Sequence, residues 1–236
     1  RWTIESWRIP TDYYGDAPEI LARIKAASEG DLWPLRSQTI SRLGAPFSAH
    51  WNAYPAPDKL LMLLLGGLVH VIGLYATANV GFFLAQITAA LAFYVVARWL
   101  RCRWEWAAAG ALLFAYTYHT FHRGLAHFSL VFTWTIPVGL AAIWLVAGSR
   151  RLAWHRPGAW VCILAALALG SSNPYNLFFW LQLMGWALLW QCFGSRRWEN
   201  LQIGVATVAA SLLAFAVMHG EAWLYVISGN GHSEID

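Results

Sequence analysis

The feature that most constrains the fold of this chain is a long stretch almost free of acidic residues. Between Leu60 and Gly220, only Glu105 and Glu199 carry a carboxylate. Of the 236 residues, 58% are hydrophobic and 12% are charged, whereas an average soluble domain has roughly 25% charged residues. This composition excludes a disordered chain, and the odd number of cysteines (three) excludes a disulfide scaffold. It predicts a polytopic membrane protein.

The apolar stretches predict six membrane-spanning helices. A helix needs roughly 17–25 apolar residues to cross about 30 Å of hydrocarbon. We expect spans at about residues 79–98, 106–121, 127–147, 158–173, 175–193 and 201–219. Residues 77–220 would then form a six-helix transmembrane bundle, and residues 221–236 would begin a loop beyond it.

Basic residues are concentrated in every second connection between these spans. The alternate connections contain only Arg123. The arginine-rich connections are therefore expected to face the cytoplasm. The net charge of +4 is then mainly a topology signal, and the lack of a basic stripe or RNA-binding motif argues against a nucleic-acid partner. The cytoplasmic set consists of Arg98, Arg101, Arg103, Arg150, Arg151, Arg156, Arg196 and Arg197.

The first 58 residues differ in kind, because they contain seven acidic residues. We predict an amphipathic helix over residues 17–28, with Ile20 and Ile24 on its apolar face and Gly30 at its end. Residues 32–57 are rich in Pro, Gly, Ser and aromatic residues and are expected to form an ordered loop. We expect the natural protein to continue beyond both ends of this sequence.

Residues 60–75 leave two arrangements open. The run is hydrophobic enough to span a membrane, which would put residues 1–58 in the cytoplasm. It is also short and contains Gly66, Gly67 and His70, which suits a helix lying in the interface. In that second arrangement, residues 1–58 lie on the outer face.

Asp12 and Asp16 in TDYYGDAPE form the first candidate site. Two carboxylates four residues apart, beside a glycine and at a membrane surface, suit a general base and a cation ligand. Asp16 and Glu19 also match a capping box, in which Asp16 accepts a hydrogen bond from the Glu19 backbone N–H. A cap holds a carboxylate rigidly, so both roles can coexist. Asp58 in PAPDKL offers the same two interpretations.

The segment YHTFHRGLAHFSL contains His119, His122, Arg123 and His127. The spacing of the three histidines is compatible with zinc binding, but no carboxylate or cysteine is nearby to complete the ligand set. Imidazole and guanidinium groups fit a phosphate or diphosphate better, and the alternative is that these residues simply end two helices at the interface. Arg123 is the only basic residue in an outer connection between spans, which suggests a functional role.

The segment SSNPYNLFFW begins the fifth predicted span. Asn173 and Asn176 can hydrogen-bond sugar hydroxyls, and Tyr175 can stack on a pyranose face. The alternative is a helix start, with Pro174 in the first position after an Asn173 cap. Glu221 in MHGEAW adds an acid on the predicted outer face. Nearly all chemically reactive residues are thus expected on one side of the membrane.

Taken together, these segments resemble the membrane glycosyltransferases of the GT-C superfamily, such as the aminoarabinose transferases and protein O-mannosyltransferases. GDAPEILARIKAASEGDLWPL is similar to the D-E/A-x-x-Y-x-x-I-A-x-x-x-x-x-G-D-W pattern of their large outer loop, and GAPFSAHWNAYPAPDKLLMLL resembles its later part. YHTFHRGLAHFSLVFTWTIPVGLA and NPYNLFFW resemble segments of uncharacterised bacterial members. The resemblance covers most of residues 10–195. One departure is that Asp16 is followed by Ala and not by a second acid.

The resemblance implies a fold and an activity. The expected fold class is all-α: a polytopic transmembrane helix bundle with an extracytoplasmic N-terminal loop that contains interfacial helices. Residues 1–58 would be that acidic loop and residues 59–76 an interfacial helix, in the plasma (inner) membrane of a bacterium. The expected activity is inverting transfer of a sugar from a polyprenyl-phosphate donor to a glycan, lipid or protein hydroxyl at the outer face.

The resemblance also implies site roles. The resemblance leaves undecided whether the protein needs a divalent cation, Mg²⁺ or Mn²⁺, as a cofactor, because the second acid of the motif is missing. The expected roles are Asp16 as the catalytic base; Asp12 and Asp58 as acceptor or metal ligands; Arg123, His127 and Arg42 as contacts to the donor phosphate; and Asn173 and Tyr175 as sugar contacts.

A non-catalytic membrane protein is the alternative, for example a translocase or an assembly subunit for a polysaccharide. A transporter predicts ionisable or broken-helix residues near the membrane midplane. The polar residues in the middle of the predicted spans are few, such as Gln86 and Gln182. This observation favours the transferase hypothesis.

Overall fold

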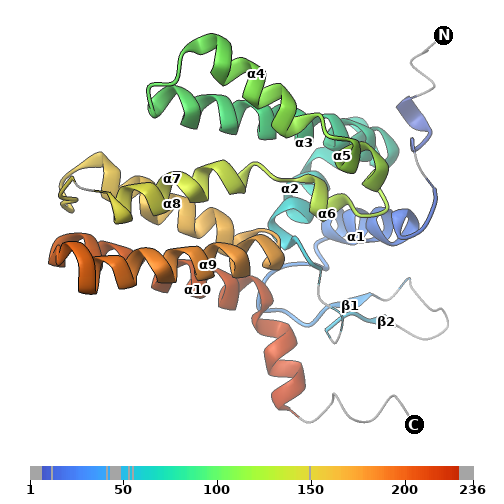
Figure 1. Ribbon diagram of the computed structural model, residues 1–236. Helices are drawn as coiled ribbons and strands as arrows, with labels where there is room; N and C mark the ends of the chain where they lie inside the picture. The colour runs from blue at the N-terminus through green and yellow to red at the C-terminus, as the bar shows by residue number, and fades with distance from the viewer. Residues whose placement is uncertain are drawn as a thin grey trace. The chain divides into compact units, whose positions relative to one another are not determined.

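The computed structural model describes residues 7–11, 13–40, 42, 49–52, 54, 56–148 and 150–228. Apart from two short strands, the regular structure of these residues is helical (Figure 1). The elements are α1 (Ala17–Glu29), β1 (Thr39–Ile40), β2 (Ala49–His50), α2 (Lys59–Ile72), α3 (Leu74–Trp99), α4 (Trp104–Ala115), α5 (Tyr118–Arg123), α6 (Phe128–Val131), α7 (Thr135–Ala147), α8 (Pro157–Ser171), α9 (Pro174–Leu189), the π-helix η2 (Trp190–Ser195) and α10 (Trp198–Ile227).

The chain folds as two compact units, and the helices α3, α6 and α10 each contribute residues to both. The first unit consists of Arg1–Phe82, Gly124–Ser129 and Phe215–Asp236. The second unit consists of Phe83–Arg123 and Leu130–Ala214.

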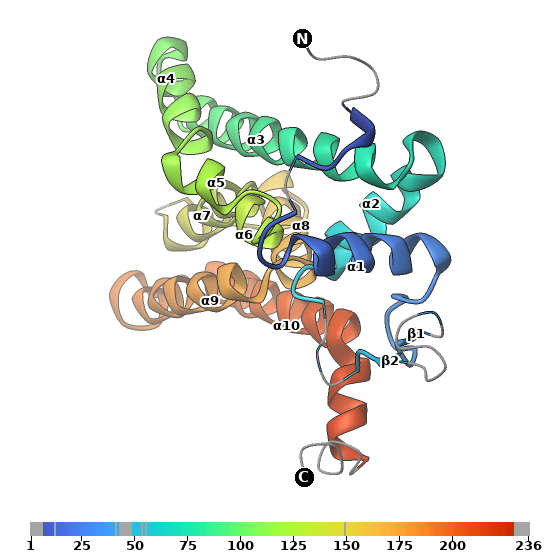
Figure 2. The ribbon, with the colours of Figure 1, turned by 90° about the vertical axis from the view of Figure 1, so that its right-hand side faces the viewer.

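The pair formed by α1 and α2 organises the first unit (Figure 2). The predicted amphipathic helix is confirmed as α1, with Ile20 and Ile24 buried on its apolar face. Gly30 ends it at φ 88°, a left-handed conformation that glycine adopts without strain. A Cβ added to Gly66 of α2 would lie 2.8 Å from Ala27 of α1, so the glycine permits the close packing of the two helices.

A two-stranded antiparallel ladder lies within the predicted loop at residues 32–57. Thr39 pairs with His50, and Ile40 pairs with Ala49. Next to it, the buried Asn52 side chain accepts a hydrogen bond from the Gln38 backbone N–H at 2.7 Å. The ladder was not predicted, because two-residue strands have too few residues for an alternating pattern.

Within the part of the chain that the structure describes, three helices are long and apolar enough to cross a membrane, by length and composition: Leu74–Trp99, Pro174–Ser195 and Trp198–Ile227. They coincide with the spans predicted at 79–98, 175–193 and 201–219. The chain is therefore helical and has the apolar helices of a membrane-associated protein.

The other three predicted spans are shorter, and two of them are interrupted. The helix predicted over 106–121 ends at Ala115, because the Thr117 hydroxyl accepts from the Thr120 N–H and starts the separate helix α5. The helix predicted over 127–147 is broken between α6 and α7. In a continuous helix the Pro137 ring would clash with the carbonyl of Thr133, so the helix restarts just before the proline. The span predicted at 158–173 becomes α8 with 15 residues.

In the second unit, α7 packs against both α8 and α9 (Figure 1). Small residues allow this close packing: a Cβ at Gly139 of α7 would lie 2.7 Å from the Trp180 ring of α9. The Trp180 indole N–H donates to the Gly139 carbonyl at 3.0 Å. The buried indole donor is thereby satisfied, as burial of a polar group requires.

Candidate functional site

The chain that leads to Asp16 is fixed by a buried asparagine of α3. The Asn79 amide donates to the backbone carbonyls of Trp7 at 3.2 Å and Ile9 at 2.8 Å, and its oxygen accepts from the Thr11 N–H at 2.9 Å. Asn79 is fully buried. Three bonds from one buried side chain hold residues 7–11 in a single backbone conformation.

A glycine turn then places Asp16 at the first turn of α1. Gly15 has φ 58°, in the left-handed region that other residues rarely adopt. A Cβ at this glycine would lie 3.4 Å from Ala126. The α1 N-terminus therefore packs against the segment Gly124–Ser129, and His127 of that segment follows directly after the contacting residue.

The capping box predicted for Asp16 and Glu19 is wrong. Asp16 occupies the N-cap position, but its side chain makes no capping hydrogen bond and is exposed. The Glu19 carboxylate turns along the helix and accepts from the Arg23 guanidinium at 2.7 Å. The Glu19 side chain is thus engaged with Arg23, and the Asp16 carboxylate is accessible at the start of the helix.

Of the other residues of the first unit that were predicted to bind phosphate or metal, one lies near Asp16 and one lies far from it. His127 is half-buried in the neighbouring segment. Arg42 is bound to Glu29 at 2.6 Å, at the opposite end of the 13-residue helix α1, so it is about 20 Å from Asp16 along the helix axis. The structure does not bring Arg42 to Asp16. Asp12 lies outside the described residues.

Asp58 caps α2, as one of its two interpretations predicted. Its carboxylate accepts a hydrogen bond from the Leu61 N–H at 3.3 Å, and the side chain is almost completely buried. Burial raises the pKa of Asp58 to about 7, and the Leu61 N–H opposes that shift only in part. This carboxyl group can therefore change its proton occupancy near neutral pH.

A buried ion pair next to Asp58 was not predicted. The Lys59 ammonium group of α2 donates to the Glu221 carboxylate of α10, and both side chains are buried. Gln38 Nε2 donates to the same carboxylate oxygen at 2.7 Å, and the Leu35 N–H reaches the other oxygen at 3.4 Å. Burial lowers the pKa of Lys59, and the Glu221 carboxylate opposes the shift. The pair joins α2, the loop after α1 and the last two turns of α10.

Arg23 is the second buried cation of the first unit. Besides Glu19, it donates to the Tyr54 carbonyl at 3.0 Å, and its guanidinium lies 4.8 Å from the Trp51 ring centroid. Its Nη1 has no hydrogen-bond partner among the described residues. Arg23 and Lys59 are close enough to repel each other, so the carboxylates of Glu19 and Glu221 are needed to balance two buried positive charges.

One sequence signal could have revealed part of this cluster. Arg23 lies three residues after Ile20 and thus on the apolar face of the helix, where a charged residue must find partners on folding. Lys59 and Glu221 are separated by more than 160 residues, so only the tertiary structure could pair them.

The remaining predicted site residues belong to the second unit. Arg123 ends helix α5. Asn173 is buried, and its side-chain oxygen accepts from the Tyr175 N–H at 2.8 Å, so the predicted helix cap is confirmed. The Tyr175 ring is 64% exposed and stays a predicted sugar contact. Among the described residues, no three His, Cys, Asp or Glu side chains gather in a way that could hold a metal ion.

The fold and its apolar helices define a helical, membrane-associated protein. No protein-family model, characterised protein or solved structure matches this chain.

Proposed function

We propose that this chain belongs to a membrane glycosyltransferase that transfers a sugar from a polyprenyl-phosphate donor to an acceptor hydroxyl at the outer membrane face. The observation that carries the proposal is the exposed Asp16 carboxylate, which makes no capping bond at the N-terminus of α1. A carboxylate without a capping role at a fixed position suits a general base. The three long apolar helices support a substrate that is itself held in a membrane.

The proposed reaction is a single inverting displacement. Asp16 accepts the proton of the acceptor hydroxyl while the acceptor oxygen forms a bond to the anomeric carbon. The bond between that carbon and the phosphate oxygen breaks, and polyprenyl phosphate leaves with the bonding electron pair. His127 donates a hydrogen bond to the departing phosphate, where negative charge develops.

The surroundings of Asp16 support this role because they are rigid. Asn79 holds the preceding chain by three hydrogen bonds, and the left-handed turn at Gly15 sets the direction in which the helix begins. A catalytic base must stay within hydrogen-bond reach of the proton that it removes. A fixed backbone on both sides of Asp16 meets this requirement.

The test is transfer by the full-length protein in membranes that contain radiolabelled prenyl-phosphate sugars of several types. We expect Asp16→Asn to lower the rate at least about 100-fold, the usual contribution of a positioned general base. Asp31→Asn is the matched control, because this residue follows the opposite end of the same helix and should leave the rate unchanged. Full activity of Asp16→Asn, at equal protein levels, would remove the assignment.

A further inference from the structure

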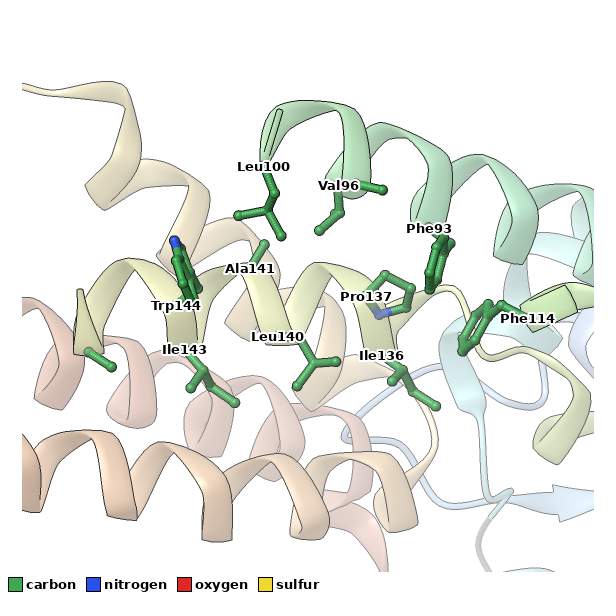
Figure 3. A pocket seen from close by; sticks show the side chains of 12 residues that line it. Phe93, Val96, Leu100, Phe114, Ile136, Pro137, Leu140, Ala141, Ile143 and Trp144 are labelled. Atoms are coloured by element: carbon green, nitrogen blue, oxygen red, sulfur yellow. The ribbon is translucent and has the colours of Figure 1, made fainter. Parts of the chain in front are cut away.

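The second unit contains an apolar groove between α3, α4 and α7. This groove is not part of the proposed catalytic site. Its volume is about 400 Å³. Phe93 of α3 and Phe114 of α4, stacked with ring centroids 5.3 Å apart, stand at one end, and Leu100 and Trp144 stand at the other (Figure 3). Trp144 is 64% exposed, so the groove is open to the surface at this end.

A basic pocket adjoins the apolar groove. This pocket has a volume of about 540 Å³ and shares Leu100 and Trp144 with the groove. Arg101 and Arg150 line it, and Trp99 is also part of its wall. Indole rings favour the boundary between hydrocarbon and lipid headgroups. The two tryptophans therefore lie where an apolar environment would change into a charged one.

Hydrogen bonds fix the main chain at both arginines. Arg101 follows α3 at φ 66°, and the Cys102 N–H behind it donates to the Ala97 carbonyl at 3.0 Å, closing the helix end. Arg150 is held by the buried Asn200, which donates to the Arg150 carbonyl at 3.1 Å and accepts from the Leu152 N–H at 2.8 Å. Among the described residues, neither guanidinium forms an ion pair.

The dimensions of the groove fit one lipid chain. On α7 the lining runs from Ile136 to Ala147, which is about 16 Å at 1.5 Å per residue. One leaflet of a bilayer contributes about half of the roughly 30 Å of hydrocarbon. A chain that begins at the basic pocket would thus reach approximately the bilayer midplane at the far end of the groove.

We propose that this groove and pocket bind one anionic phospholipid, with an acyl chain against α3 and α7 and the phosphate between Arg101 and Arg150. Charge complementarity selects an anionic headgroup over a zwitterionic one. By the positive-inside pattern, the two arginines are expected at the cytoplasmic leaflet, and the lipid site does not depend on the proposed sugar transfer.

The test is binding of phosphatidylglycerol and phosphatidylcholine to the purified full-length protein in detergent, measured by native mass spectrometry. Arg101→Asn removes the charge and keeps a residue that tolerates the left-handed conformation. We expect about fivefold weaker phosphatidylglycerol binding for Arg101→Asn or Arg150→Gln, and about 25-fold for the double variant, from the usual contribution of each basic residue near a membrane. Phosphatidylcholine binding should be weaker and unchanged by these variants.

Arg103→Gln is the matched control. Arg103 lies two residues from Arg101 at the same membrane side, but it is paired with Glu105 at 3.0 Å and does not line the pocket. An equal loss of binding in this control would mean general attraction of anionic lipids and would overturn the proposal. Equal affinity for phosphatidylcholine and phosphatidylglycerol would overturn it as well.

A second variant tests the groove itself. Ala97→Phe adds a ring to the groove lining on α3 and should weaken phosphatidylglycerol binding. In the unmodified protein, glycerol phosphate has no acyl chain and should therefore fail to compete with phosphatidylglycerol. Competition by glycerol phosphate at concentrations similar to the lipid would show that the chain contributes nothing and would refute the groove assignment. Unfolding temperatures of all variants identify any misfolded one, and the Arg101→Asn result decides the headgroup site independently.

Discussion

The buried pair of Lys59 and Glu221 allows a sharp test of how the first unit is held together. Glu221 accepts from the Lys59 ammonium, from Gln38 at 2.7 Å and from the Leu35 N–H at 3.4 Å. Glu221→Leu removes the carboxylate and leaves a buried cation without a counter-charge. Loss of one partner of a buried pair costs about 3–5 kcal/mol, and the orphaned Gln38 donor adds about 1–3 kcal/mol if no water reaches it.

Replacing both partners should restore most of the stability. The double variant Lys59→Met with Glu221→Leu removes both charges of the pair and leaves Arg23 bound to Glu19, and such apolar replacements of a buried pair are often neutral or stabilising. The coupling energy, which is the double loss minus both single losses, should therefore be negative and at least about 5 kcal/mol in magnitude, because each single loss is about 3–5 kcal/mol. This sign distinguishes an ion pair from two residues that pack independently.

The assay is denaturant unfolding of the full-length protein in detergent, followed by tryptophan fluorescence. Glu105→Gln is the control, because its partner Arg103 is exposed and such surface pairs contribute at most about 1 kcal/mol. A cost below about 1 kcal/mol for Glu221→Leu, against the 3–5 kcal/mol expected for a broken buried pair, would refute the reasoning. A double variant whose loss equals the sum of the single losses would refute it too.

Two further predictions concern local packing and pH. Because burial raises the pKa of Asp58 from 3.8 to about 7, its contribution to stability is complete below about pH 4 and is lost as pH rises through 7; the total is roughly 4 kcal/mol at about 1.4 kcal/mol per pKa unit. Asp58→Asn, which keeps the cap, should remove this part of the pH dependence in unfolding titrations, and a profile identical to that of the unmodified protein would contradict the burial argument. Gly170→Ala should cost about 1–3 kcal/mol, because its Cβ would meet the Ser211 carbonyl oxygen of α10. Gly185→Ala is the control, because no atom lies within 4 Å of the added Cβ at this helical site. This variant should stabilise the protein by about 0.5–1 kcal/mol. Equal shifts of the melting temperature for the two variants would show that the α8–α10 contact is not tight.

Local sequence patterns predicted the elements whose cause is local. The apolar periodicity and Gly30 predicted α1, and Asn173 and Pro174 predicted the start of α9. The pattern over 127–147 predicted one helix where there are two, although Pro137 was visible in the sequence. Hydropathy measures how apolar a segment is and does not register the backbone clash that interrupts it.

In the candidate site too, the local sequence shows which bonds are possible but not which of them form. The side chain of Glu19, the second residue of the capping motif, binds Arg23 and not the helix N-terminus. The sequence shows both the capping motif and its competitor four residues further on. Which bond forms was decided by the buried surroundings of Arg23, including the Tyr54 carbonyl and the Trp51 ring.

The sequence by itself determined that the chain is helical, that it has apolar helices of membrane-spanning length and where its basic residues gather, because chain composition and period set these properties. Only the tertiary structure decided that Lys59 meets Glu221, that Asn79 fixes the chain before Asp16, and that Arg101 and Arg150 line one pocket. These contacts join residues far apart in the chain, and their free energy depends on burial and geometry that no local pattern contains.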